Sequence, residues 1–317
     1  MTAQASKRPR LIKFLVGAVL LVLLFGGAAR LIAAGGAKSL NIGDRLLGDS
    51  DGATLQLAGQ PYGPGERNKL NIWMPTGAKK TDRLAVLVFL YGGGWYSGAR
   101  DDYGFVGRAF AKQGFVVVIP DYRIVPEGHW PDFLRDSAAA VAWTDAHIAN
   151  YGGDPDRIAL SGHSAGAYNA MMLALDPKWM QAEGSDASVI RGVAALAGPY
   201  DFYPFEKGGR ADVAMGDIRP VEQTQPIHFA RADAPPLWLG HGTADTVVRV
   251  RNSRRLAAEM QKVGGSATLR EYDGLSHNDL VMALTRPLAY KGPILPEMTD
   301  FLRGVTARRV SPAPPPP

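Results

Sequence analysis

Residues 158–169 read IALSGHSAGAYN, and this stretch decides the fold. Its first three residues are apolar, and good helix formers fill residues 165–175, so we expect a strand, a sharp turn and a helix. Gly162 and Gly166 allow the strand and the helix to approach closely, while Ser164 projects its hydroxyl from the turn. Chance alone supplies such a G-x-S-x-G pattern about 0.2 times in a chain of this composition, so its place between strand and helix carries the argument.

Short apolar runs recur along the chain and predict further strands. They occur at 70–73, 84–90, 115–119, 193–196, 237–239 and 267–272. Helix-length segments alternate with them, at 103–112, 133–149, 165–175, 253–263 and 296–303. This alternation predicts an α/β fold whose mostly parallel central sheet is covered by helices on both faces. Ligands bind beyond the carboxyl ends of such strands, so we expect the chemistry in the loops that follow them.

Length and charge indicate one domain between two atypical ends. The chain has 317 residues and a formal net charge of +5, and residues 1–37 carry five cations and no acidic residue. The body, which we place at 39–306, is therefore near neutral, and this disfavours nucleic-acid binding. Cysteine is absent from the sequence, which excludes disulfides and thiol catalysis. The oligomeric state is not indicated.

Residues 1–38 are expected to form a signal peptide or a membrane anchor helix. Four cations precede an apolar run at 14–29, which is long for a signal-peptide core and short for a spanning helix. Positive charge on the N-terminal side predicts an exported body, periplasmic or secreted after cleavage and otherwise anchored to the membrane and facing outward. The proline-rich segment 307–317 is expected to be a disordered tail.

Ser164 needs a base and an acid to act as a nucleophile. A serine hydroxyl is weakly nucleophilic at neutral pH unless a histidine, itself oriented by a carboxylate, takes its proton. Asp245 and His277 each follow a predicted strand, so both are expected where the loops converge on Ser164. Asp273 and Asp279 are rival acids, but each lies too near His277 in sequence to orient it easily.

The other histidines are expected to have structural roles. His241 precedes Asp245 and is expected to pack or to shape its loop, and His163 is a neighbour of Ser164 at the turn. The histidine and glutamate spacings of metal hydrolases do not occur in the sequence, so neither a metal nor another cofactor is expected.

A glycine-rich segment, YGGGW at 91–95, follows the predicted strand 84–90. Acyl transfer develops an oxyanion that needs preorganised N–H donors, and glycines allow backbone amides to face a substrate. We expect the N–H groups of Gly93, Gly94 and Ala165 to form this oxyanion hole.

Four motifs together resemble a known group of enzymes: YGGGW at 91–95, DYRIVPE at 121–127, YGGDPDRI at 151–158 and GHSAG at 162–166. They are similar to motifs of the hormone-sensitive-lipase-like and feruloyl-esterase-like carboxylesterases, which include relatives of kynurenine formamidase and isoprenylcysteine methylesterase. The resemblance implies an eight-stranded α/β-hydrolase sheet over the catalytic domain. It also implies the triad Ser164, His277 and Asp245, and the oxyanion hole of Gly93, Gly94 and Ala165.

Substrate contacts are expected from aromatic residues and one histidine near these motifs. They are Tyr91, Trp95, His163, Tyr200 and Phe202. Tyr91 departs from the histidine usual in the lipase-like branch. A cap is hard to find, because little sequence separates the leader from the first strands, so we expect a comparatively open site. The segment 199–220 is a candidate rim, although clustered aromatics after a strand are as often plain packing.

These features predict a serine carboxylic-ester hydrolase that acts on small to medium esters through an acyl-enzyme. Amide hydrolysis, by a formamidase or a peptidase, is an alternative, because a triad stabilises the same tetrahedral geometry for both bonds. A membrane-anchored pseudoesterase that only binds is the non-enzymatic alternative. The expected partner is a small-molecule ester, with membrane contact through the N-terminal segment if it is not cleaved.

Overall fold

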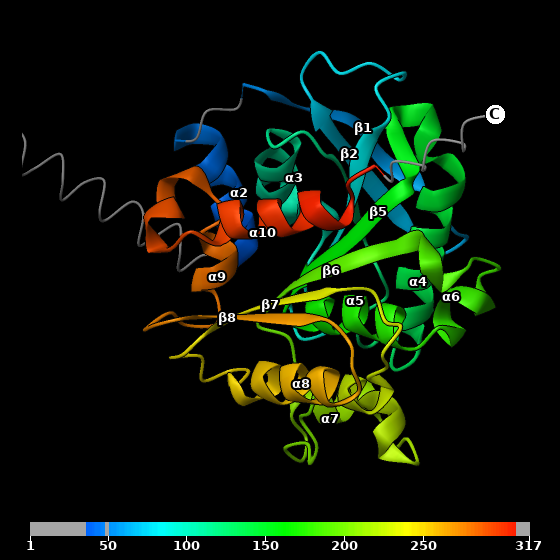
Figure 1. Cartoon of the computed structure of the whole chain (residues 1–317), viewed down its shortest axis with the longest axis vertical. Helices are drawn as coiled ribbons and strands as arrows, with labels where there is room; N and C mark the ends of the chain where they lie inside the picture. The colour runs from blue at the N-terminus through cyan, green and yellow to red at the C-terminus, as the bar shows by residue number, and fades with distance from the viewer. Residues whose placement is uncertain (1–35, 48–50, 309–317) are drawn as a thin grey trace, which may run out of the picture.

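The computed structural model describes residues 36–47 and 51–308 (Figure 1). The predicted leader up to residue 35 and the tail from residue 309 lie outside the described residues. Across the described ranges, every helix is too short or too polar to cross a bilayer.

A single sheet of eight strands organises the described chain, as the resemblance implies. Its strand order is β1-β2-β4-β3-β5-β6-β7-β8, with β1 and β2 antiparallel to their neighbours and the rest parallel. The predicted α/β class and mostly parallel sheet are therefore confirmed. The strands are β1 (Ala53–Pro61), β2 (Lys69–Pro75), β3 (Leu84–Leu90), β4 (Val116–Pro120), β5 (Gly153–His163), β6 (Ile190–Leu196), β7 (Leu237–Gly242) and β8 (Ala267–Tyr272).

Helices cover both faces of the sheet (Figure 1). Helices α3 and α10 lie on one face, and α4, α5 and α8 lie on the other. Consecutive residues of β3, such as Val86, Leu87 and Val88, are fully buried, because each face of the strand has a helical layer against it. The α-helices are α2 (Gly36–Leu47), α3 (Gly104–Ala111), α4 (Asp132–His147), α5 (Ala165–Leu175), α6 (Lys178–Ala182), α7 (Arg210–Met215), α8 (Arg251–Lys262), α9 (Asp279–Met282) and α10 (Ile294–Val305).

Helix α2 was not expected from the sequence, and it begins inside the segment predicted as leader. Leu40 is buried on its inner side, while Ile42 and Leu46 are exposed. Asp44 forms an ion pair with Arg108 of α3 at 2.7 Å, and both side chains are nearly buried. This pair, together with Leu40, attaches α2 to the sheet domain beside the carboxyl edge of the strands.

Candidate active site

Ser164 occupies a strained turn between β5 and α5. Its backbone has φ 55° and ψ −121°, a conformation that costs free energy for a residue with a side chain. The neighbouring glycines make the turn possible. A β-carbon on Gly166 would lie 2.0 Å from the carbonyl oxygen of Leu90, and one on Gly162 would lie 2.5 Å from the carbonyl carbon of Gly166. The close approach of strand and helix expected from the sequence is therefore present.

Ser164, His277 and Asp245 form a continuous chain of hydrogen bonds. Oγ of Ser164 lies 2.9 Å from Nε2 of His277, and Nδ1 of His277 lies 2.7 Å from Oδ2 of Asp245. Because a carboxylate only accepts, Nδ1 carries the proton in the neutral imidazole, and Nε2 is left to accept from the serine hydroxyl. The exposed fractions are 9%, 8% and 5%, so the chain is nearly shielded from bulk water.

Asp245 remains ionised in this buried position because it accepts several hydrogen bonds. Burial by itself raises the pKa of Asp245, but hydrogen bonds from His241 and His277 outweigh burial and hold that pKa well below its usual range. The other oxygen, Oδ1, accepts from the backbone N–H groups of Val247 at 2.9 Å and Val248 at 2.8 Å. The carboxylate is thus fixed in charge and in orientation toward His277.

His241 connects the acid to its own loop, as its position in the sequence suggested. Its ring is fully buried, with Nε2 2.7 Å from the carbonyl oxygen of Val248 and 3.3 Å from Oδ2 of Asp245. Both partners only accept, so we assign the proton to Nε2. Nδ1, 2.7 Å from Oγ of Ser253, then accepts from that hydroxyl. The sequence indicated a structural role but not this direct contact with Asp245.

His163 packs against the triad without joining it. Nε2 of His163 lies 3.0 Å from the carbonyl oxygen of His277, and the two ring centroids are 4.7 Å apart. Burial and the nearby charge of His277 lower the pKa of His163 to about 3, so this ring is neutral at physiological pH. As a neutral donor, it fixes the main chain of His277.

The glycine loop after β3 passes beside the nucleophile. A β-carbon on Gly92 would lie 3.1 Å from Cβ of Ser164, and Gly93 and Gly94 adopt φ values of 132° and 62°. Gly93 and Gly94 line the same cavity as Ser164 and Ala165. Ala165 opens helix α5, so its N–H has no partner within the helix and is available to an anion. The three expected oxyanion donors therefore lie in the wall of the cavity that holds Ser164.

The cavity at Ser164 has a volume of about 950 Å³. Trp95, His163 and Phe202, three of the five expected substrate contacts, line it. Tyr91 and Tyr200 do not. Both are fully buried, and their placement at the substrate was wrong.

Tyr91 and Tyr200 are held in the core by hydrogen bonds and, for Tyr91, by ring stacking. The Tyr91 hydroxyl donates to Asp121 at 2.9 Å, and its ring stacks on Tyr122 with centroids 4.7 Å apart. The Tyr200 backbone N–H donates to the side chain of Asn252 at 2.9 Å. The sequence does not indicate whether an aromatic ring beside a glycine loop or after a strand points into the core or into the cavity.

Helix α2 covers part of the cavity, which makes the site less open than the sequence suggested. Ala37, Lys38 and Leu40 of α2 line the cavity together with Phe202 and Phe205 of the segment after β6. The aromatic rim expected at 199–220 therefore contributes to the pocket, and α2 is the part of the wall that sequence reasoning missed.

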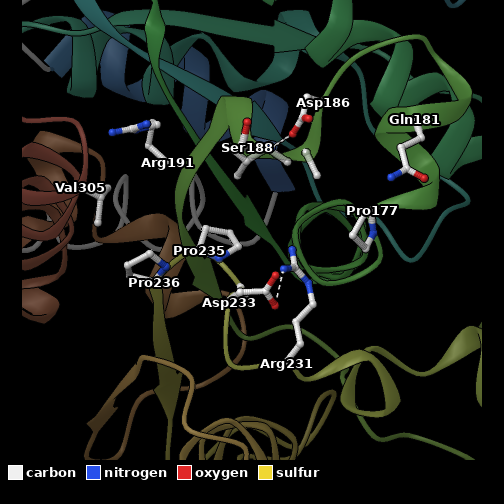
Figure 2. A pocket seen from close by; sticks show the side chains of 13 residues that line it. Pro177, Gln181, Asp186, Ser188, Arg191, Arg231, Asp233, Pro235, Pro236 and Val305 are labelled. Carbon is white, nitrogen blue, oxygen red and sulfur yellow. Dashed lines mark hydrogen bonds and ion pairs between the residues drawn. The ribbon is translucent and has the colours of Figure 1, made fainter. Parts of the chain in front are cut away.

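A second hollow of about 570 Å³ lies at the amino ends of β6 and β7, at the opposite edge of the sheet (Figure 2). Arg231 pairs there with Asp233 at 2.9 Å, and Asp186 accepts from the backbone N–H of Ser188 (Figure 2). Its lining has a serine but no histidine. A serine paired with a histidine base is thus found at Ser164 and not in the lining of this hollow.

Metal ligation finds no support in the described part of the chain. Within it, histidine, aspartate and glutamate side chains do not gather in groups of three that could hold an ion.

Comparisons with known proteins identify a family and several similar esterases. A family model described as BD-FAE matches residues 70–260, more than half of the chain. A probable isoprenylcysteine alpha-carbonyl methylesterase of Oryza sativa subsp. japonica is 30% identical over 242 residues, covering 70% of this chain and 56% of that protein. Esterase LipC of Mycobacterium tuberculosis is 32% identical over 254 residues, covering 72% of this chain and 62% of LipC. The chain thus spans little more than half the length of these relatives.

The fold also matches a solved esterase. The structure of Thermogutta terrifontis esterase 2 phosphorylated by paraoxon superimposes with a TM-score of 0.67 at 27% identity. The match covers 82% of this chain and 98% of that one. The eight-stranded sheet is therefore the sheet of an α/β-hydrolase.

Proposed function

The chain belongs to the BD-FAE family, and from this premise we propose that it is a serine carboxylic-ester hydrolase with Ser164 as its nucleophile. The observation that carries the proposal is the hydrogen-bonded series from Ser164 through His277 to Asp245, at 2.9 Å and 2.7 Å. The esterases among its relatives, and the paraoxon-phosphorylated structural neighbour, support the same reaction class. We propose small to medium esters as substrates.

The first half of the proposed reaction acylates the enzyme. Oγ of Ser164 attacks the substrate carbonyl carbon, and its proton passes to Nε2 of His277. The carbonyl π electrons move to oxygen, and the oxyanion accepts hydrogen bonds from the N–H groups of the glycine loop and Ala165. When this intermediate collapses, the bond to the alkoxy oxygen breaks, and the proton on Nε2 leaves with the alcohol.

The second half repeats these steps with water. Water loses a proton to Nε2 of His277 as its oxygen bonds to the acyl carbon. Collapse then breaks the bond to Oγ of Ser164, which recovers the proton from Nε2, and the carboxylic acid is released. Asp245 stays ionised throughout and stabilises the imidazolium that forms in each half.

A fluorophosphonate probe and a panel of p-nitrophenyl esters test this function. We expect the wild type to be labelled once and to hydrolyse the esters, whereas Ser164→Ala loses both properties and unfolds at the wild-type urea concentration. Ser161→Ala is the matched control, because Ser161 precedes the turn on β5 and is fully buried. Retained turnover in folded Ser164→Ala would contradict the assignment. Absence of labelling and turnover in the wild type would favour the binding-only alternative.

The same panel separates esters from amides. It includes a feruloyl ester, N-formylkynurenine and a p-nitroanilide, since the triad serves ester and amide bonds alike. We expect the esters to be hydrolysed faster, because an alcohol is a better leaving group than an amine.

Export is proposed on the sequence of the leader alone. Cations before the apolar run at 14–29 favour translocation of the following domain. N-terminal sequencing of the protein recovered from cell fractions tests it: cleavage gives a new N-terminus near residue 38, and an intact anchor leaves the protein in the membrane fraction.

A further inference from the structure

Three arginine side chains line the cavity that holds Ser164. They are Arg210 at the start of α7, Arg249 in the loop after β7, and Arg251 at the start of α8. The proposed reaction at Ser164 uses none of them, because His277 handles the proton and backbone N–H groups receive the oxyanion.

Arg210 lies beside the expected oxyanion loop. A β-carbon placed on Gly94 would be 3.2 Å from Cδ and 3.6 Å from Nη1 of Arg210. The guanidinium carbon also lies 5.8 Å from the centre of the Tyr96 ring, which is a cation–π contact. These contacts place the Arg210 side chain beside Gly94, in the wall of the cavity that holds Ser164.

The three arginines have no carboxylate partner within the part of the chain that the structure describes. Neighbours on α8 differ in this respect: Arg254 pairs with Glu271 at 2.6 Å, and Arg255 pairs with Asp201 at 2.6 Å. Arg254 and Arg255, which have carboxylate partners, do not line the cavity. The arginines that line it are the ones without such a partner.

Two acidic side chains also line the cavity, but they leave its charge positive. Asp102 and Lys38 both line the cavity, and the charge of Lys38 acts on Asp102. The opposite charges of these two side chains cancel. Glu206 and the ionised Asp245, which lies behind His277, then oppose three arginines. An ester that carries a carboxylate meets a favourable potential here, whereas a neutral ester does not.

Resting on the proposed esterase function, we propose that the cavity selects esters that bear a second, anionic group, with Arg210 as the specificity-determining residue. The anion is a carboxylate on the acyl chain or on the alcohol. The guanidinium presents paired N–H donors that match a carboxylate, and Arg249 and Arg251 add to the attraction.

Two matched pairs of substrates test the proposal. On the acyl side, mono-p-nitrophenyl adipate is compared with p-nitrophenyl hexanoate, which has the same chain length without the carboxylate. On the alcohol side, 4-acetoxybenzoate is compared with 4-acetoxybenzamide. We expect kcat/KM to favour the anion in at least one pair by about 5- to 10-fold at low salt, mainly through KM, and the preference to shrink at high salt.

Variants test whether residues of the cavity cause the preference for the anionic ester. Arg210→Gln is expected to bring the ratio of kcat/KM for the anionic ester to kcat/KM for its neutral partner close to one. Arg254→Gln, an exposed arginine of α8 outside the cavity, is the control and is expected to keep the preference. If Arg210→Gln does not fold, the double variant R249Q/R251Q is expected to reduce the preference.

The outcomes distinguish this inference from the proposed function. Equal rates within both pairs overturn the inference while esterase activity stands. An equal loss of kcat on neutral and anionic esters in Arg210→Gln also overturns it, because the guanidinium then acts on the oxyanion of every substrate. If neither ester of a pair is hydrolysed and Ser164 is not labelled, the esterase function itself fails.

Discussion

Nε2 of His241 lies 3.3 Å from Oδ2 of Asp245, the same oxygen that accepts the hydrogen bond from Nδ1 of His277 at 2.7 Å. Asp245 therefore holds two histidines, of which only His277 reaches Ser164. His241 in turn is fixed by Ser253 and by the carbonyl of Val248. A buried donor that orients the acid without meeting the substrate is a positioning residue.

The first prediction concerns this positioning role. In His241→Gln, we expect kcat for p-nitrophenyl esters to fall about 10- to 100-fold with KM little changed, because the buried N–H that lies 3.3 Å from Oδ2 of Asp245 is lost. Active-site titration with a fluorophosphonate separates the two possible causes. A positioning role lowers the labelling rate of every site, whereas a folding defect lowers only the number of sites.

Ser253→Ala is the matched control for His241. Ser253 contacts Nδ1 of His241 and does not touch Asp245, so we expect a smaller loss of kcat than in His241→Gln. An equal kcat in His241→Gln and the wild type would show that His277 and the backbone of Val247 and Val248 suffice to orient the acid.

The second prediction concerns stability and pH through His163. Its pKa is lowered from 6.5 to about 3 in the folded protein, so between these values the unfolded chain binds a proton that the folded protein does not. The contribution of His163 to the free energy of unfolding is therefore complete above 6.5, the pKa in the unfolded chain, and is lost as the pH falls below that value. From pH 7 to pH 5, the expected loss is about 2 kcal/mol.

Urea unfolding at pH 7 and pH 5 measures this loss. His163→Gln is expected to show less decrease than the wild type, and His129→Gln, a change of an exposed histidine, is expected to follow the wild type. A decrease in His163→Gln as large as that of the wild type would assign the pH dependence to other groups.

Much of the fold was predictable because its central strands are continuous apolar runs. The run at 84–90 matches the central strand β3 residue for residue, and 165–175 matches α5. The more polar segment 267–272 also matches β8, at the edge of the sheet. Strand β1 was missed, since it pairs only with β2 at the edge of the sheet, and its exposed and half-exposed residues include Thr54 and Gln56. Helix α2 was missed because the leader expected from the sequence extends into it, to residue 38.

The candidate site was predictable wherever backbone topology alone decides placement. Ser164, Asp245 and His277 each follow a strand of one parallel sheet, so their loops had to meet at one edge. The pocket wall was less predictable. Tyr91 turned into the core instead of the cavity, and Leu40 and Arg210 reach the cavity from helices that have no motif.

The third prediction concerns the ion pair that holds α2. Asp44 and Arg108 are nearly buried, so Asp44→Ala leaves an uncompensated guanidinium, and we expect a loss of about 3 to 5 kcal/mol in the free energy of unfolding or local detachment of α2. The double variant D44A/R108L is expected to recover part of this loss, because neither charge remains buried. Urea unfolding and limited proteolysis near residue 47 measure both effects. Wild-type stability and proteolysis in Asp44→Ala would contradict the role of the pair.

The fourth prediction concerns the turn at Ser164. In Gly166→Ala, the new β-carbon would lie 2.0 Å from the carbonyl oxygen of Leu90, which is backbone of the central strand β3 and cannot rotate away. Either the strand and α5 separate or the turn unwinds, so we expect a loss of about 3 kcal/mol or more in the free energy of unfolding and loss of fluorophosphonate labelling.

Gly304→Ala is the control. A β-carbon there, in α10, meets no atom within 4 Å, and alanine in a helix is favoured over glycine by up to about 1 kcal/mol. The two variants should therefore shift the urea midpoint in opposite directions. A Gly166→Ala protein with the midpoint and labelling of the wild type would show that β5 and α5 do not pack against Leu90 as closely as the 2.0 Å contact requires.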